Sequence, residues 1–260
     1  MPLVRPSRRS LALAAAAATL GATLYGVGAA TADTSVPRSD KEIPNLTNVV
    51  NDIKAYYGDT VVGGEHYASA DSNYARQVAG IETKAKADLT HALRHVAPGT
   101  KPAIVLDVDD TSLLTYNYEL EVGFSYSSAS NQAYLDSKDM PAVFGMDTLA
   151  NWAAGQGVEV FWITGRPEAQ RADTVRNLTA VGYKAAPDTA HLYLKNPANP
   201  PAYLACGSTC TTTEYKSGTR AHIESLGYDI IGNFGDQYSD LSGGHADTSV
   251  KLPNPMYYLP

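Results

Sequence analysis

The sequence predicts an α/β fold in which a mostly parallel sheet carries helices on both faces. Two largely apolar runs, residues 103–108 (AIVLDV) and 157–164 (GVEVFWIT), are typical of strands covered on both sides. Segments with helical periodicity separate these runs from further short strands. Strands that alternate with helices favour parallel pairing, because each crossover leaves room for a helix.

The first 32 residues have the features of a secretory signal peptide. They contain three arginines, no acidic residue, an Ala/Leu-rich segment and a small-residue cleavage site that ends at Ala32. The segment SRRSLAL, Ser7 to Leu13, also resembles a twin-arginine export signal. A retained membrane anchor is the alternative interpretation. We expect a secreted protein, with residues 33–260 as one domain and no stable membrane anchor after cleavage.

Residues 33–100 are predicted to form an N-terminal helical extension of that domain. A polar tether precedes two stretches with helical periodicity, residues 46–57 and 72–96. The second helix should end before Pro98 and Gly99, which break helices. We expect both helices to pack on the core.

Residues 112–150 form an insertion that is too long for an ordinary connection between a strand and the next helix. Its part from Tyr116 to Asp139 is rich in Tyr and Ser, and a helix is predicted only over residues 146–156. The insertion leaves the first strand at a group of aspartates. We therefore predict a flap or small cap over a site; an irregular surface excursion is the alternative.

The second half of the chain continues the alternation of strands and helices. A helix over residues 168–182 should end at Gly182. The further predicted elements are short strands over residues 191–194, 229–235 and 249–252 and a helix over residues 215–227.

Composition restricts the partners of the protein. The formal net charge is −7, and signal cleavage would remove three basic residues. So acidic a chain is a poor candidate for binding a nucleic-acid polymer, because such binding requires Lys and Arg to neutralise phosphates.

The two cysteines of the chain, Cys206 and Cys210, lie in a loop rich in Gly, Ser and Thr. In an exported protein they predict a disulfide, with a zinc site as the alternative.

Polar side chains collect at the carboxyl ends of the predicted strands, where parallel α/β sheets bind ligands. They are Asp107, Asp109, Asp110 and Thr111 after the first strand, Thr164, Gly165 and Arg166 after the second, Asp236 and Asp240 after the strand over residues 229–235, and Lys216 at the start of a helix. Carboxylates, a hydroxyl and a lysine at one sheet edge would suit a hard divalent cation and a phosphoryl group.

Taken alone, each of these residues has a simpler structural explanation. Asp110 and Thr164 are candidate helix caps, and Lys216 is a candidate solvated side chain. Asp236 and Asp240 are candidate loop carboxylates. A calcium-binding EF-hand is excluded, because the residues after the D-x-D pair lack the glycine and the closing glutamate of that loop.

Four ordered motifs make the chain resemble the haloacid dehalogenase-like (HAD) hydrolase superfamily: DVDDT, ITGRPE, the lysine of YKSGTR, and GDQYSD. The longer segments KPAIVLDVDDTSL, GNFGDQYSDLSGG and KLPNPMYYLP are similar to secreted, class B-like HAD acid phosphatases that include the plant vegetative storage proteins. The resemblance runs from about Tyr67 to Pro260. It implies a Rossmann-like sheet and a phosphatase that hydrolyses small-molecule phosphate monoesters.

The resemblance also implies roles for the aspartates. Asp107 would be the nucleophile that forms an aspartyl phosphate, and Asp109 the general acid and base. The implied cofactor is Mg²⁺, held by Asp107, the backbone carbonyl of Asp109, and Asp236, with Asp240 as a further ligand. Asp110 is expected to point aside and brace the following turn.

Three other residues are implied to contact the substrate. Thr164 and Lys216 would hold the phosphoryl oxygens, with Lys216 also offsetting the carboxylate charge. Arg166 is a further candidate for substrate binding. The alternatives are a phosphotransferase or nucleotidase with the same site, a catalytically weak binding or storage protein on the same scaffold, and a phosphorelay receiver domain. The presence of Asp107 favours a working enzyme.

Overall fold

The computed structural model describes residues 44–259, so the predicted signal peptide lies outside the described part of the chain. By their internal contacts, residues 1–49 and 50–260 form two separate units. Helix α2 (Leu46–Tyr57) begins in the first unit and ends in the second. The second unit contains the sheet and the predicted site and is described below.

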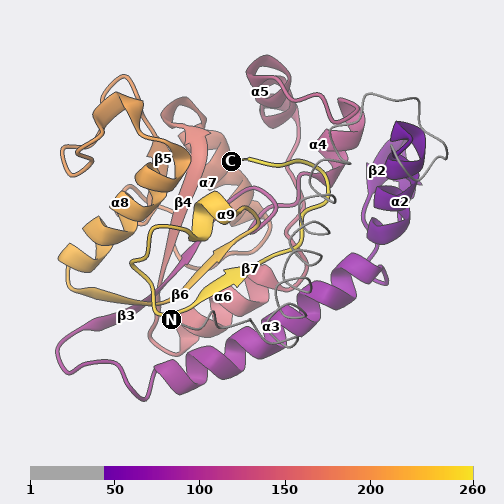
Figure 1. Ribbon diagram of the computed structural model, residues 1–260. Coiled ribbons are helices and arrows are strands. Elements are labelled where there is room, and N and C mark those ends of the chain that lie inside the picture. The colour runs from indigo at the N-terminus through magenta and orange to yellow at the C-terminus, as the bar shows by residue number, and fades with distance from the viewer. Residues whose placement is uncertain (1–43, 260) are drawn as a thin grey trace, which may run out of the picture. The chain divides into compact units, whose positions relative to one another are not determined.

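Five strands form the central sheet, in the order β5-β4-β3-β6-β7 (Figure 1). Their bounds are β3 (Lys101–Leu106), β4 (Glu159–Pro167), β5 (Leu192–Lys195), β6 (Tyr228–Gly235) and β7 (Ser249–Lys251). Every pairing between them is parallel, which confirms the predicted fold class. The strand order reverses between β3 and β6, and ligands bind at such a switch point in parallel sheets.

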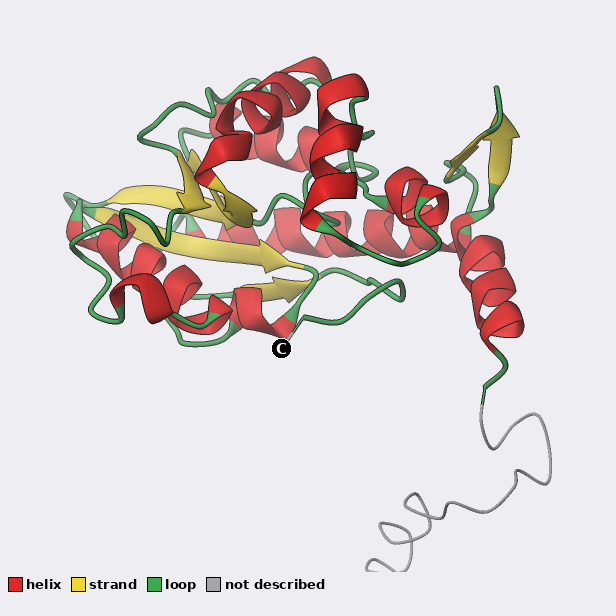
Figure 2. Cartoon of the chain, turned by 90° about the horizontal axis from the view of Figure 1, so that it is seen from above, coloured by secondary structure: helices red, strands yellow, loops and turns green. Residues whose placement is uncertain are grey.

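The sheet separates two apolar cores because side chains alternate along each strand. On β3, Ile104 and Leu106 join one core, and Ala103 and Val105 join the other. Helices lie on both sides of the strands, as Figure 2 shows. The first core takes side chains from α3 (Asn73–Ala92), α6 (Met146–Gly155) and α7 (Arg171–Ala180), and the second from α8 (Thr212–Ser225).

The N-terminal extension contains the two predicted helices and a hairpin that the sequence analysis missed. Strands β1 (Thr60–Val62) and β2 (Glu65–Tyr67) pair antiparallel. Gly63 and Gly64 join them with φ values of +62° and +89°, as the favoured two-residue hairpin turn requires. The strands have three residues each, too few for a clear alternation of apolar and polar side chains.

Three helices begin within the insertion over residues 112–150, of which the sequence analysis predicted only α6. Helix α4 (Tyr116–Glu121) and helix α5 (Ser128–Ser137) precede it. Helix α5 begins with a capping box in which Ser127 and Ser130 bond to each other's backbone N–H groups. Serine replaces the usual glutamate of that motif, so the helix start is hard to see in the sequence.

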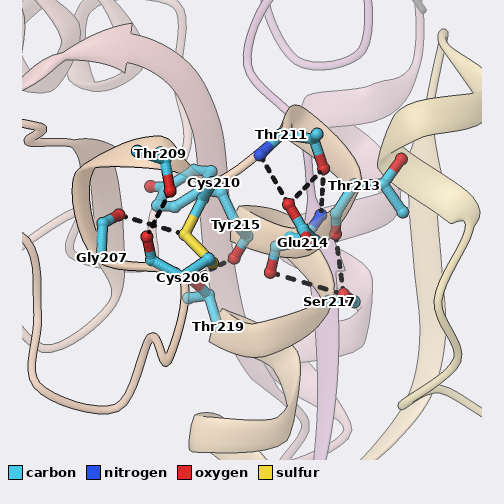
Figure 3. The surroundings of a disulfide bond; sticks show 10 residues. All are labelled: Cys206, Gly207, Thr209, Cys210, Thr211, Thr213, Glu214, Tyr215, Ser217 and Thr219. Carbon is cyan, nitrogen blue, oxygen red and sulfur yellow. Dashed lines mark hydrogen bonds between the residues drawn. A yellow bond between two sulfur atoms is a disulfide. The ribbon is translucent and has the colours of Figure 1, made fainter.

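Helix α8 begins at Thr212, three residues before the predicted start, because the preceding residue caps it. The Thr211 hydroxyl accepts from the Glu214 N–H, and the Glu214 carboxylate accepts from the Thr211 N–H. The predicted disulfide between Cys206 and Cys210 is present directly before this cap (Figure 3). It closes the short loop from which α8 starts.

Two other boundaries also differ from the predictions. Strand β3 ends at Leu106, because the chain bends after it toward a residue with positive φ, Asp110. The helix predicted over residues 168–182 is a 3₁₀ turn (η1, Glu168–Gln170) followed by α7, and Gly182 follows α7 with φ +101°. Among residues 44–259, no helix is long and apolar enough to span a bilayer.

Candidate functional site

A cavity of about 440 Å³ opens at the carboxyl ends of the central strands. Its walls come from the ends of β3, β4 and β6, from α4 and the chain that follows it, and from residues 252–259 after β7, here called the C-terminal tail. The tail is the last part of the yellow chain in Figure 1. The cavity therefore combines residues that the sequence analysis predicted for the site with two further segments, α4 with the chain that follows it and the C-terminal tail. Only the fold reveals the contribution of these two segments.

Lys216 lies between two carboxylates in the floor of the cavity. Its Nζ donates to Asp107 Oδ1 at 2.6 Å and to Asp240 Oδ1 at 2.5 Å, and the three residues are each at least nine-tenths buried. Burial raises the pKa of Asp107 well above its usual range, against the opposing charge of Lys216. Burial alone would lower the pKa of Lys216, but the two carboxylates outweigh it and raise that pKa.

Three carboxylates converge beside this lysine. Asp107, Asp236 and Asp240 each offer an oxygen, and these oxygens all lie within 4.8 Å of one another. Burial, with the charges of neighbouring carboxylates, raises the pKa of Asp236 to about 7. A single lysine cannot neutralise three buried carboxylates. The oxygen-only donor set and its excess negative charge fit a hard divalent cation such as Mg²⁺.

Asp240 is placed by a short helix that the sequence analysis did not predict, α9 (Tyr238–Leu241). The buried guanidinium of Arg220 donates to the Asp240 carbonyl at 2.7 Å and to two further carbonyls of the loop after α9. A Cβ on Gly235 would lie 2.4 Å from the Asp240 Cβ. Only glycine at the end of β6 therefore allows α9 to fold back so closely.

Asp109 faces the cavity and pairs with Arg166. Arg166 Nη2 lies 2.7 Å from Asp109 Oδ1, and its Nε lies 2.9 Å from Asp109 Oδ2. The arginine also donates to Thr174 Oγ1 at 3.1 Å and is buried, whereas the Asp109 side chain is 28% exposed. Arg166 lines the cavity, but its guanidinium is directed at Asp109 and fixes that carboxylate in a two-point contact.

Asp110 turns away from the cavity, as the sequence analysis expected. It has φ +51°, and its carboxylate accepts from the Thr115 N–H, the Thr115 hydroxyl at 2.6 Å and the Tyr257 hydroxyl at 2.7 Å. Burial raises its pKa to about 7, while these hydrogen bonds oppose the shift. The residue thus braces the turn that holds Asp107 and Asp109.

Thr164 lies fully buried near the end of β4 and is not among the residues that line the cavity, whereas Gly165 is. The Thr164 hydroxyl accepts a hydrogen bond from the Arg166 N–H at 3.1 Å.

The turn after Asp107 has two free backbone donors. Within residues 44–259, the backbone N–H groups of Asp109 and Thr111 have no hydrogen-bond partner. These donors follow the nucleophile candidate and are suited to an anion.

The sequence analysis missed several residues that shape the site. Asn254 Nδ2 donates to Asp236 Oδ2 at 2.8 Å, so the C-terminal tail holds a candidate metal ligand directly. The Leu259 N–H donates to Gln237 Oε1 at 3.0 Å. Glu119 on α4 also lines the cavity. An acidic residue within the aromatic segment YNYELEV was the one sequence signal for Glu119, and the tail contacts had none.

Comparison with known proteins gives a family match over most of the chain. The model of the family described as HAD superfamily, subfamily IIIB (acid phosphatase), matches residues 19–260. Acid phosphatase 1 of Solanum lycopersicum is 35% identical over 162 residues, 60% of this chain and 58% of that protein. Vegetative storage protein 1 of Arabidopsis thaliana is 30% identical over 222 residues, 84% and 74% of the two chains.

The stem 28 kDa glycoprotein of Glycine max is 32% identical over 166 residues, 61% of each chain. The matched region thus spans about three fifths of the glycoprotein and of the tomato phosphatase. Among solved structures, the class C acid phosphatase from Bacillus anthracis is similar, with a TM-score of 0.61 and 21% identity over 82% of this chain and 86% of that one. At this identity the likeness supports the fold.

Proposed function

This chain belongs to the acid phosphatase family of the HAD superfamily, subfamily IIIB, and from that premise we propose that it is a secreted, Mg²⁺-dependent phosphomonoesterase that acts through an aspartyl phosphate. The substrates would be small-molecule phosphate monoesters. The disulfide between Cys206 and Cys210 supports export, because such bonds persist in oxidising compartments. The predicted signal peptide would direct the export of the protein.

One observation carries the proposal: Asp107 faces the cavity beside a buried lysine and two further carboxylates. The Lys216 ammonium contacts Oδ1 of Asp107, and no hydrogen bond within residues 44–259 engages Oδ2. This arrangement keeps one oxygen of a buried carboxylate available for attack. The lysine offsets negative charge that would otherwise repel a phosphate.

The chemistry follows in two steps. In the first, an Asp107 carboxylate oxygen forms a bond to phosphorus, the bond from phosphorus to the ester oxygen breaks, and Asp109 donates its proton to the departing alkoxide. In the second, Asp109 takes a proton from water, the water oxygen bonds to phosphorus, and the bond to Asp107 breaks. Arg166 holds Asp109 in place for both transfers.

Asp107, Asp236, Asp240 and the backbone carbonyl of Asp109 would hold Mg²⁺. When bound, the ion would offset the charge of the carboxylates and of the phosphoryl oxygens. Lys216 and the free backbone N–H groups of Asp109 and Thr111 would bind the phosphoryl oxygens. Thr164 would assist through the backbone of Gly165 and Arg166, which its buried hydroxyl holds in place.

The test is turnover of p-nitrophenyl phosphate with Mg²⁺ by the wild type and by Asp107→Asn. The variant should lose at least about 10³-fold in kcat, because it removes the nucleophile, while its melting temperature shows that it is folded. Rapid acid quenching with labelled substrate should trap a phosphoaspartate on the wild type only. Asp52→Asn, at an exposed position on α2, is the matched control and should keep full activity.

Near-normal turnover by Asp107→Asn would refute the nucleophile assignment. The vegetative storage protein among the relatives supplies a second candidate, a binding protein with little activity. Stoichiometric phosphate binding without turnover of any monoester would support that alternative.

A further inference from the structure

Glu119 is a buried acid that the proposed mechanism does not use. It lies on α4, is 4% exposed and lines the cavity. Within residues 44–259 its carboxylate has neither a hydrogen-bond partner nor an ion-pair partner. The buried aspartates at the strand ends differ, because each of them is paired or hydrogen-bonded.

An unpaired buried carboxylate is unfavourable, and native proteins usually pair such groups. Burial, with a contribution from the charge of Asp109, raises the pKa of Glu119 to about 7. The nearby cations do not compensate it. Arg166 is engaged by Asp109 and Lys216 by two other aspartates, and Lys195, which also lines the cavity, is beyond ion-pair distance of Glu119.

The residues that line the cavity with Glu119 favour a positively charged ligand. Tyr118, Phe124, Tyr126 and Tyr258 line the same cavity, and the faces of aromatic rings attract cations. Gln170, also in the wall, has a buried side-chain oxygen with no hydrogen-bond partner among the described residues. Glu119 and Gln170 therefore both present acceptors without partners to the cavity, and Lys195 is a cation in the same wall that no ion pair engages among the described residues.

We propose that Glu119 is a specificity-determining residue that selects phosphate monoesters whose leaving alcohol carries a cationic ammonium group. The inference rests on the proposed function, since the phosphate must sit at Asp107 for the other end of the substrate to reach α4. The ammonium group supplies the charge and the hydrogen-bond donors that Glu119 lacks. Anionic leaving groups are repelled, and neutral alkyl groups leave the carboxylate unpaired.

The experiment compares ω-aminoalkyl phosphates of two to six carbons with n-alkyl phosphates in which a methyl group replaces the ammonium. With Mg²⁺ present, the wild type should favour the amino ester at the best chain length by about tenfold or more in kcat/KM. A hydroxyalkyl series tests whether a neutral donor is sufficient. The chain-length series locates the carboxylate relative to the phosphate.

Glu119→Gln keeps the shape of the side chain and removes its charge, so the amino-to-alkyl ratio should fall to about one. Glu121→Gln is the matched control. It lies two residues further along α4, is exposed and pairs with Lys138, and it should leave the ratio unchanged. A ratio is an internal measure, so partial loss of folded protein does not alter it.

The outcomes separate this inference from the proposed function. Turnover of p-nitrophenyl phosphate with no amino preference would overturn the role of Glu119 and leave the phosphatase intact. An amino preference that survives in Glu119→Gln would also overturn it, as would a hydroxyalkyl preference equal to the amino preference. No turnover of any monoester would instead refute the proposed function.

Discussion

The two ends of the cavity treat charge in opposite ways. At the proposed phosphate end, formed by Asp107, Lys216, Asp236 and Asp240, every charged group has a hydrogen-bond partner among its neighbours, although the carboxylates outnumber the one lysine. At the leaving-group end, formed by Glu119 and the aromatic residues around it, the one buried charge has no partner. Under the proposals above, the first end would carry the chemistry, which needs fixed groups, and the second would select substrates through a group that a ligand completes.

The C-terminal tail contacts both ends. Asn254 donates to Asp236 at the phosphate end, and Tyr257 donates to Asp110 in the turn behind it. Tyr258, 72% exposed, lines the leaving-group end. One short segment therefore supports a candidate metal ligand, Asp236, and also forms part of the wall that would meet the leaving alcohol. Changes within the tail should act on the two ends separately.

Of the changes that compare the two ends, metal removal should have the largest effect, and it acts on the phosphate end. Dialysis against EDTA should reduce turnover of p-nitrophenyl phosphate at least about 100-fold, because the buried carboxylates would then repel the phosphate. Added Mg²⁺ should restore it. Undiminished turnover by the metal-free protein would show that Lys216 alone compensates Asp107, Asp236 and Asp240, and would remove the metal from the proposal.

Asn254→Ala should weaken the metal site without changing selection. The variant leaves Asp236 with fewer hydrogen bonds, and loss of such support typically lowers metal affinity about tenfold or more. The Mg²⁺ concentration that gives half-maximal activity should rise accordingly, while the amino-to-alkyl ratio stays constant. Tyr258→Ala is the matched comparison and should alter KM for the substrate alone. If each variant changed both the Mg²⁺ requirement and the KM for the substrate, the two ends would not be independent.

The phosphate end was largely predictable from sequence because its aspartates follow the strands β3 and β6. The apolar runs located β3 and β4, and parallel pairing brings their carboxyl ends together with that of β6. The strand order therefore predicts Asp107, Asp109 and Asp236 at one edge of the sheet. The partner of Asp109 was not predictable, because the direction of Arg166 depends on packing around Thr174 in α7.

The leaving-group end was not predictable for a physical reason. Glu119 acquires its character from its place in a cavity whose other walls come from segments far away in the sequence, including Tyr258 of the tail. Local patterns report only neighbours within a few residues. Helix α5 likewise begins at a serine capping box with little apolar periodicity, and the hairpin around Gly63 has strands of three residues each. These elements depend on contacts that the sequence order does not display.

The smallest expected effect concerns stability, and it tests whether the charge at the leaving-group end is truly uncompensated. Burial raises the pKa of Glu119 to about 7, so the folded protein holds this proton more tightly than the unfolded chain. The carboxyl therefore costs nothing at low pH, and its cost grows as the pH rises from the unfolded pKa of roughly 4.3 through 7. Glu119→Gln does not titrate and escapes that cost.

Melting temperatures of the metal-free protein at pH 5 and pH 8 measure the difference. Relative to the wild type, Glu119→Gln should gain on the order of 1 kcal/mol between the two pH values, or about 2 to 4 °C for a chain of this size. Glu121→Gln loses only an exposed pair with Lys138 and should show no such gain. A Glu119→Gln difference that is the same at pH 5 and pH 8 would mean that water already compensates Glu119, and the contrast between the two ends would then disappear.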